Sequence, residues 1–285
     1  MKKIRIDAET QLRVFEDWGD FTKQTEQPSE MPRNKRGSRD SDHAWAGGSF
    51  EQAITRAKTG WPEGRNEFVA MAERLKDALQ SEIDRPTLEW DVTGDWVDID
   101  AYLQGQPENM IHHSQTPANR EMNLTITVDL CQSSMVSADS IIRRGVGIAA
   151  LIDLLECAGF STEVIAVLPI EVSKSAINEV TEFQIPIKRN GQPMDIDLMG
   201  YSLVSPTVLR RLVFSIMEQE PQAFRKAYNV GHGYGYPKPN RTVLGKTSQL
   251  HISNSDGMVS TFEKTEEWVK GHLKALGALR EEVTA

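Results

Sequence analysis

The second half of the chain contains a strand–helix–strand unit that restricts its fold more than any other feature. Residues 124–129 and 162–168 are short apolar runs, which are typical of buried strands. Residues 138–158 lie between them and carry apolar side chains at helical spacing up to Gly159, where the helix is expected to end. Strands that alternate with helices of this length predict an α/β fold, with a mostly parallel sheet covered by helices on both faces.

Further strands and helices are predicted around this unit. Residues 180–187 and 194–204 alternate apolar and polar side chains, and an Asn-Gly dipeptide at 190–191 favours a hairpin between them. We also predict helices at about 206–218 and 221–228, a strand at 250–252 and a closing amphipathic helix after it. Residues 122–285 are therefore predicted to form one α/β domain.

Residues 1–121 are predicted to form an N-terminal region of two helices and a β-hairpin. Ser49 and Gln52 form a capping-box pattern at the start of the first helix, and a second helix is expected over about 65–82. From 87 to 103 the apolar side chains recur at every second residue, which predicts the hairpin. This hairpin could extend the main sheet instead of forming a core of its own.

Composition and charge exclude several classes of protein. No run approaches the roughly 18 consecutive apolar residues of a membrane-spanning helix, and residues 1–7 become charged too soon for a signal peptide. We therefore expect no membrane partner and a cytoplasmic location, in the bacterial host if the protein is phage-encoded. The 32 Lys and Arg against 41 Asp and Glu give a net charge of −9, so the basic footprint typical of duplex-DNA binding is missing. The two cysteines form neither a zinc motif nor a disulfide framework.

A group of polar residues follows the predicted strands at their carboxyl ends. In an open α/β sheet, ligands bind beyond this end of the strands. Asp129 ends the first strand, and Cys131 and Ser133 follow two and four residues later, so several polar atoms can point to one place. Thr207 opens a later helix, and Asp256 begins an Asp-Gly dipeptide after a later strand.

This order of elements resembles the von Willebrand factor A-type domain and its metal-ion-dependent adhesion site, over about residues 122–282. That family begins with strand–DxSxS–helix. Asp129 matches the aspartate and Ser133 the second serine, whereas Cys131 replaces the first serine. The same sequence positions thus suggest a degenerate adhesion site.

The later motifs of the family match in part. Thr207 corresponds to the family's threonine without its preceding glycine pair, and Asp256 lies two residues further from its strand than the pattern requires. The resemblance implies a non-enzymatic binding or adaptor protein that presents Asp129, Thr207 and Asp256 to a protein partner. Because some such domains act beside AAA+ ATPases, it suggests an AAA+ ATPase or a phage complex as the partner. The general character of the chain also suggests a bacteriophage or bacterial protein.

We expect no cofactor at this site. Mg²⁺ requires hard oxygen ligands in near-octahedral geometry, and the thiol of Cys131 is a poor substitute for a hydroxyl. The resemblance therefore implies a metal-free member of the family, in which Cys131→Ser is expected to restore part of the Mg²⁺ binding.

Two other functions remain open. An enzyme would be a metal-dependent hydrolase that uses Asp129 and Asp256, but no catalytic set converges in the sequence and we expect no enzyme. The alternative is a single-stranded nucleic-acid-binding accessory factor of phage or bacterial transcription or replication, because stacking aromatics beside basic residues suit single strands. Its candidate contacts are Arg33, Lys35, Arg36 and Arg39 in one segment and Tyr234, Tyr236, Lys238 and Arg241 in another.

Overall fold

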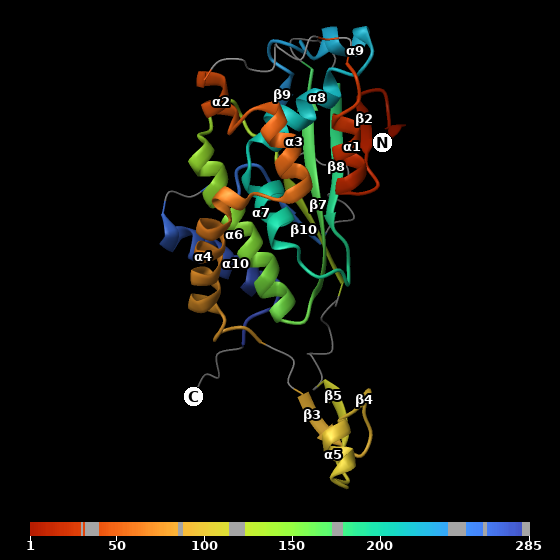
Figure 1. Ribbon diagram of the computed structural model, residues 1–285, viewed down its shortest axis with the longest axis vertical. Helices are drawn as coiled ribbons and strands as arrows, with labels where there is room; N and C mark the ends of the chain where they lie inside the picture. Colours follow the sequence, from red (N-terminus) through yellow and green to blue (C-terminus); the bar gives the residue numbers. More distant parts are fainter. Residues whose placement is uncertain are drawn as a thin grey trace.

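The structure of the protein is a computed structural model, and two parts of the chain are separate in it (Figure 1). A main body contains a large sheet with its helices, and a small three-stranded module projects from one end of the long axis. The structure describes residues 1–29, 31, 40–84, 88–113, 123–172, 179–238, 249–258 and 261–280.

The main sheet has the strand order β1-β2-β8-β7-β6-β10, with β9 paired to β7. Its strands β10, β6 and β7 run parallel, with β10 at the edge, which confirms the α/β class and the strand–helix–strand unit. β8 is antiparallel to β7, and β1 and β2 continue the sheet beyond β8. The strands are β1 (Lys2–Arg5), β2 (Thr10–Val14), β6 (Asn123–Asp129), β7 (Ser161–Glu171), β8 (Val180–Lys188), β9 (Tyr236–Pro237) and β10 (Leu250–Ile252).

The helices form layers over the main sheet. α1, α6 and α7 contact its strands, and α4 packs across α6, α7 and α10. α6 and α7 approach closely, because a Cβ at Gly145 would lie 2.6 Å from the carbonyl oxygen of Leu203. The helices are α1 (Trp18–Thr25), α2 (Asp40–Ala46), α3 (Phe50–Thr59), α4 (Pro62–Leu79), α6 (Ala138–Cys157), α7 (Ile196–Val204), the π-helix η2 (Val208–Val213), α8 (Phe214–Met217), α9 (Gln222–Ala227) and α10 (Phe262–Ala275). No described helix combines the length and the apolar character that crossing a membrane requires.

One face of the main sheet belongs to the hydrophobic cluster, and the other face carries polar as well as apolar side chains. In β6, Ile126 and Val128 belong to the hydrophobic cluster that includes the helices, whereas Thr125 and Thr127 alternate with them. The strand registers pair Asp129 with Val167 and Val167 with Gln184, so these side chains share that other face. Buried Val167 lies outside the hydrophobic cluster.

The predicted second layer of helices is not found among the described residues, whose strand-contacting helices pack against the apolar face. The reason is the alternation within the strands. A sheet covered by helices on both faces needs near-continuous apolar strands, and the threonines of β6 interrupt that run.

The segment predicted as a strand at 194–204 is a helix instead. Asp195 caps α7 by accepting a hydrogen bond from the backbone N–H of Leu198 at 2.9 Å. Met199 and Leu203 are buried at a spacing of four, so the apolar pattern fits a helix as well as a strand. The antiparallel partner of β8 is β7, which precedes it in the chain.

The segment predicted as a hairpin at 87–103 forms a separate module. Its strands β3 and β4 both pair with β5, so the sheet order is β3-β5-β4 and no strand of it joins the main sheet. The predicted second strand is cut short because Asp98 caps a helix by accepting from the N–H of Ala101 at 3.1 Å. The module comprises β3 (Leu88–Asp91), β4 (Trp96–Val97), α5 (Ile99–Leu103) and β5 (Met110–His113).

Candidate binding site at the carboxyl end of the sheet

Asp129 lies fully buried at the carboxyl end of β6. Its Oδ1 accepts a hydrogen bond from the backbone N–H of Cys131 at 2.7 Å, whereas its Oδ2 has no hydrogen-bond partner. Burial raises the pKa of Asp129 to about 7, although the bond from Cys131 and the charge of Arg144 act in the opposite direction. This carboxyl group is therefore partly protonated near neutral pH.

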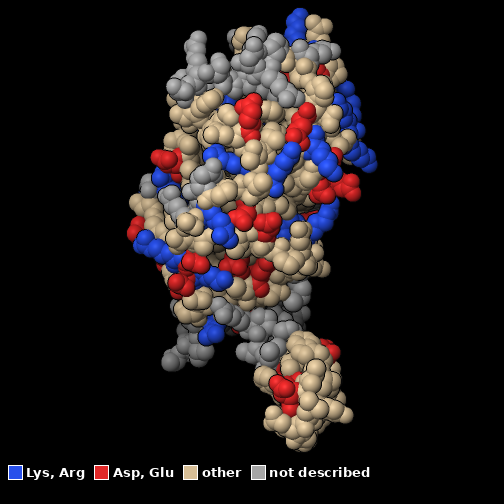
Figure 2. Space-filling view, in the orientation of Figure 1, with Lys and Arg blue, Asp and Glu red and all other residues tan. Residues whose placement is uncertain are grey.

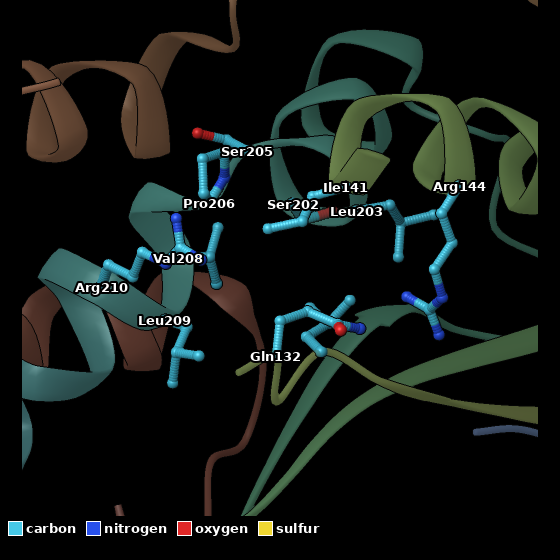
Figure 3. Close-up of a pocket in the computed structure, with 11 residues that line it drawn as sticks. Gln132, Ile141, Arg144, Ser202, Leu203, Ser205, Pro206, Val208, Leu209 and Arg210 are labelled. Atoms are coloured by element: carbon cyan, nitrogen blue, oxygen red, sulfur yellow. The ribbon is translucent and has the colours of Figure 1, made fainter. Parts of the chain in front are cut away.

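Arg144 connects the two loops that carry the predicted site. It extends from α6 toward the strand ends (Figure 3). Its Nη2 donates to the carbonyl oxygens of Asp129 at 3.0 Å and Ser253 at 2.8 Å, and its Nε donates to that of Asp256 at 2.7 Å. Burial lowers the pKa of Arg144 to about 10, while the charges of Asp129 and Asp256 act to raise it, so the guanidinium stays charged.

The loops after β6 and β10 also bind each other directly. Gln132 Nε2 donates to the carbonyl oxygen of Asn254 at 2.8 Å, and Asn254 Nδ2 donates to that of Cys131 at 3.1 Å. The Cys131 side chain is buried, and burial raises the pKa of its thiol well above the usual value. Cys131 is therefore a protonated packing residue and a poor nucleophile or metal ligand.

The carboxylate of Asp256 is used within its own loop. Its Oδ2 accepts from the backbone N–H of Ser253 at 2.9 Å and from the Ser253 hydroxyl at 2.8 Å. The structure thus brings Asp256 to the same arginine as Asp129, but its side chain closes a turn.

Thr207 does not join the other predicted residues. The hydroxyl of Tyr201 donates its single proton to the carbonyl oxygen of Ala53 at 2.9 Å. Tyr201 therefore accepts from the Thr207 hydroxyl, 2.8 Å away, and Thr207 in turn accepts from Ser205 at 2.7 Å. This buried network fixes α7 against α3 and leaves the Thr207 hydroxyl no part in the site at Asp129.

These residues do not fit Mg²⁺, the ion of the adhesion site that the sequence resembles. The Thr207 hydroxyl and the Asp256 carboxylate are bound elsewhere, and position 131 offers a thiol. The site already contains a positive charge, because the Arg144 guanidinium donates hydrogen bonds to three carbonyl oxygens at the strand ends. Within the described part of the chain, no group of three or more His, Cys, Asp or Glu side chains is placed to hold a metal ion.

A cavity of about 450 Å³ lies beside the loop that follows Asp129, at the carboxyl ends of β6 and β7. Segments 131–134 and 231–237, which are far apart in the sequence, both line it, together with Trp45, Ile170, Leu209, Arg210, Arg211 and Phe214. Ser133 lines this cavity, and its carbonyl oxygen accepts from Arg210 Nη2 at 3.2 Å. A much smaller cavity, of about 20 Å³, separates Arg144 from Arg210 (Figure 3) and has room for about one water molecule.

Arg210 holds the wall of the larger cavity together. Its Nη2 also donates to the carbonyl oxygen of Val136 at 3.0 Å, and its Nη1 donates to that of Trp45. The guanidinium carbon lies 4.4 Å from the centroid of the Trp45 ring, at cation–π distance. Burial lowers the pKa of Arg210 to about 10, so it remains a cation at neutral pH. Arg210 belongs to the π-helix η2, a rare element that is frequent at functional sites.

Two of the predicted nucleic-acid contacts, Tyr234 and Lys238, make contacts that stabilise the fold. Tyr234 stacks on Phe214 with ring centroids 3.9 Å apart, and its hydroxyl donates to Glu218 Oε1 at 2.6 Å. Lys238 Nζ forms an ion pair with Glu171 at 2.6 Å. Among the described members of this predicted set, Tyr236 is the most exposed, at 51%. Of the other predicted contacts, Arg33, Lys35, Arg36, Arg39 and Arg241 lie outside the described residues.

Sequence reasoning missed Arg144, Arg210 and Trp45. Arg144 had a detectable signal, because it lies between Ile141 and Ile148 on the apolar stripe of α6, where a charged side chain needs a buried partner. Arg210 and Trp45 had none, since their contact joins segments 165 residues apart.

Comparison with known families gives one match. The model of a domain of unknown function, DUF7192, matches residues 2–280. No curated protein and no solved structure matches the chain.

Proposed function

The chain belongs to the DUF7192 family, a domain of unknown function. On the geometry of its site, we propose that it is a non-enzymatic binding or adaptor protein, with a degenerate von Willebrand A-like site that engages a protein partner. The partner contacts the end of the sheet around the cavity that segments 131–134 and 231–237 share. This cavity, formed where the resemblance places the adhesion site, is the observation that carries the proposal.

The position of the predicted residues supports the von Willebrand A-like assignment. Asp129 ends a central parallel strand, and the loop with Asp256 follows the neighbouring parallel strand β10. Arg144 joins the backbones of both loops. In this proposal the arginine supplies the positive charge and the fixed loop geometry for which the family uses an ion.

The side chains around the cavity favour a protein partner. Met135, beside the first lining segment, is 89% exposed, and the lining residues Tyr236 and Trp45 are 51% and 37% exposed. They come from three separate segments of the chain. Methionine and aromatic residues are enriched in protein interfaces.

Affinity capture with paired variants tests this function. The tagged full chain is used to capture proteins from native lysate, and the captured partner is then purified and its Kd measured. Tyr236→Asp and Met135→Asp should each weaken binding at least tenfold, because a carboxylate would enter a desolvated interface. Ile196→Asp is the matched control, since Ile196 is 39% exposed at the start of α7, does not line the cavity and should leave the Kd unchanged. A partner whose Kd responds equally to all three variants would contradict the proposal.

Single-stranded nucleic acid is the second candidate ligand, and one observation favours it. Arg210 and Arg211, each 3% exposed, form part of the wall of the cavity that Tyr236 also lines, so positive charge lies behind the exposed ring. Fluorescence anisotropy with a labelled oligonucleotide at two salt concentrations separates the two candidates. Salt-dependent binding that Tyr236→Ala abolishes would replace the protein partner by a nucleic acid.

A further inference from the structure

The projecting module of residues 88–113 exposes an unusual amount of apolar surface. It carries seven of the twelve large hydrophobic side chains that are exposed in the described chain. On its helix α5, Ile99 is 69% exposed and Leu103 is 74% exposed, and their i, i+4 spacing puts them on one side of the helix. Surfaces of this kind on a monomer mark interaction sites.

The two tryptophans of the module lie on the same face of its sheet. The strand registers pair both Trp90 and Trp96 with Ile111 of the central strand. The rings therefore flank Ile111, and they are 48% and 42% exposed. Trp90 Nε1 donates to Asp98 Oδ2 at 2.9 Å, which fixes the orientation of the ring.

The charge of the module has one sign. Residues 88–113 contain six Asp and Glu and no Lys or Arg. Figure 2 accordingly shows acidic but no basic side chains on it, in contrast to the mixed surface of the main body. A groove of about 520 Å³ combines both properties, since Trp90 lines it together with Asp98, Asp100 and Glu108.

We propose that this module is a docking surface for a basic segment of a partner protein, one that carries apolar side chains next to Lys or Arg. A Lys or Arg of that segment lies in the groove, where the face of Trp90 and the carboxylates both attract a cation. The apolar side chains of the segment cover the exposed tryptophans and α5. This surface is distinct from the cavity of the main body, so the inference stands apart from the function proposed above.

Charge decides against a second copy of the chain as the occupant. In a symmetric pairing each module would face the other's six carboxylates, and the module has no Lys or Arg to compensate them. An acidic membrane surface or a nucleic acid is opposed by the same charge. A basic protein segment is the occupant whose charge complements the module.

Tryptophan indole signals in ¹⁵N NMR spectra of the full chain locate the binding. The probe is a 12-residue synthetic peptide of alternating Leu and Lys. We expect it to shift the indole signals of Trp90 and Trp96, and to leave those of Trp45 and the buried Trp18 unchanged. Peptides with Glu in place of Lys, or with Ser in place of Leu, should bind at least tenfold more weakly.

Paired variants complete the test. Ile99→Gln with Leu103→Gln should weaken the probe at least tenfold, and Asp100→Asn with Glu108→Gln should weaken it and reduce its salt dependence. Met135→Gln and the charge-matched pair Glu266→Gln with Glu267→Gln should have no effect. Shifts at Trp45 that Met135→Gln removes would assign the peptide to the main-body cavity and overturn the inference. Absence of binding, equal binding of the Ser peptide, or concentration-dependent shifts of Trp90 and Trp96 without peptide would also overturn it.

Discussion

Arg144 binds Asp129 through the backbone carbonyl, with Nη2 3.0 Å from the carbonyl oxygen, while Oδ2 of the same aspartate has no hydrogen-bond partner. The guanidinium therefore holds the end of β6 in place without a hydrogen bond to either oxygen of the Asp129 carboxylate. This explains how burial can raise the pKa of Asp129 to about 7 beside a cation. The backbone carbonyl of Asp129, bound by Arg144, thus has a structural role, whereas the carboxyl group of Asp129 titrates. The two roles can be tested separately.

Arg144→Ala should lower the free energy of unfolding by about 3–5 kcal/mol, because three carbonyl oxygens, two of them in buried hydrogen bonds, lose their donor. Arg144→Lys should recover only part of this loss, since one ammonium group cannot reproduce the fork that reaches both loops. Urea denaturation gives both values. Arg65→Ala is the control, because its ion pair with Asp197 is about half exposed and should contribute no more than about 1 kcal/mol. Equal losses for Arg144→Ala and Arg65→Ala would show that the loops do not depend on Arg144.

Asp129→Asn should change how stability depends on pH. The pKa of Asp129 is raised in the folded state, so the contribution of this group to stability is fully present below pH 3.8 and is lost progressively until about pH 7. Asn keeps the acceptor for Cys131 but cannot ionise. Relative to wild type, the variant should therefore gain up to about 4 kcal/mol between pH 4 and pH 8, at about 1.4 kcal/mol per pKa unit.

Denaturation at pH 4.5, 6 and 8 measures this difference. Glu267→Gln removes an exposed carboxylate and should follow the wild-type curve at every pH. If the Asp129→Asn curve also runs parallel to wild type, the carboxyl group does not titrate in this range.

The central fold could be predicted because its pattern is local. The apolar runs of β6 and β7 and the long stripe of α6 each identify their element without reference to the rest of the chain. The helix α7 could not be identified in this way, since its apolar spacing also fits a strand and the cap at Asp195 decides the outcome. Which strands pair is still less local, as the separate sheet of β3, β5 and β4 demonstrates.

The candidate site was predictable in position but not in chemistry. Asp129 and Asp256 reach the same end of the sheet because parallel strands align their carboxyl ends. The direction of the Thr207 hydroxyl, however, depends on Tyr201 and Ala53, and only the packing of α7 against α3 brings these together. Likewise, the cavity forms only where two loops about 100 residues apart meet, and no local sequence pattern predicts that contact.

Gly235→Ala should disturb the cavity loop more than a comparable glycine replacement elsewhere. Gly235 has a φ of 77°, and a Cβ there would lie 2.6 Å from the carbonyl oxygen of Glu171. Gly191 has a similar φ of 71° with no atom within 4 Å, so it is a matched control for backbone strain alone. We expect Gly191→Ala to cost about 1 kcal/mol of unfolding free energy, and Gly235→Ala to cost about 1–3 kcal/mol more. Equal costs would mean that the loop can move away from β7 without penalty.

Mg²⁺ should leave the Tm of both the wild-type protein and Cys131→Ser unchanged. At the sequence level, Cys131→Ser was expected to restore part of the ion binding, but the Thr207 hydroxyl is bound to Tyr201 and the Asp256 carboxylate to Ser253. A new hydroxyl at position 131 would therefore still lack the partner oxygens that a hard ion requires. It would also place a polar group at a buried position, so Cys131→Ser should lower the Tm in the presence of EDTA.

Differential scanning fluorimetry in 5 mM Mg²⁺ and in EDTA decides between these expectations, because a ligand that binds the folded state alone raises the Tm. The informative variant is Cys131→Ser combined with Arg144→Gln, which supplies the hydroxyl and removes the competing cation. Its Tm should stay insensitive to Mg²⁺ if the fixed directions of Thr207 and Asp256 exclude the ion. A Tm that rises with Mg²⁺ in the double variant alone would show that the guanidinium of Arg144, rather than the directions of those two side chains, keeps the ion out.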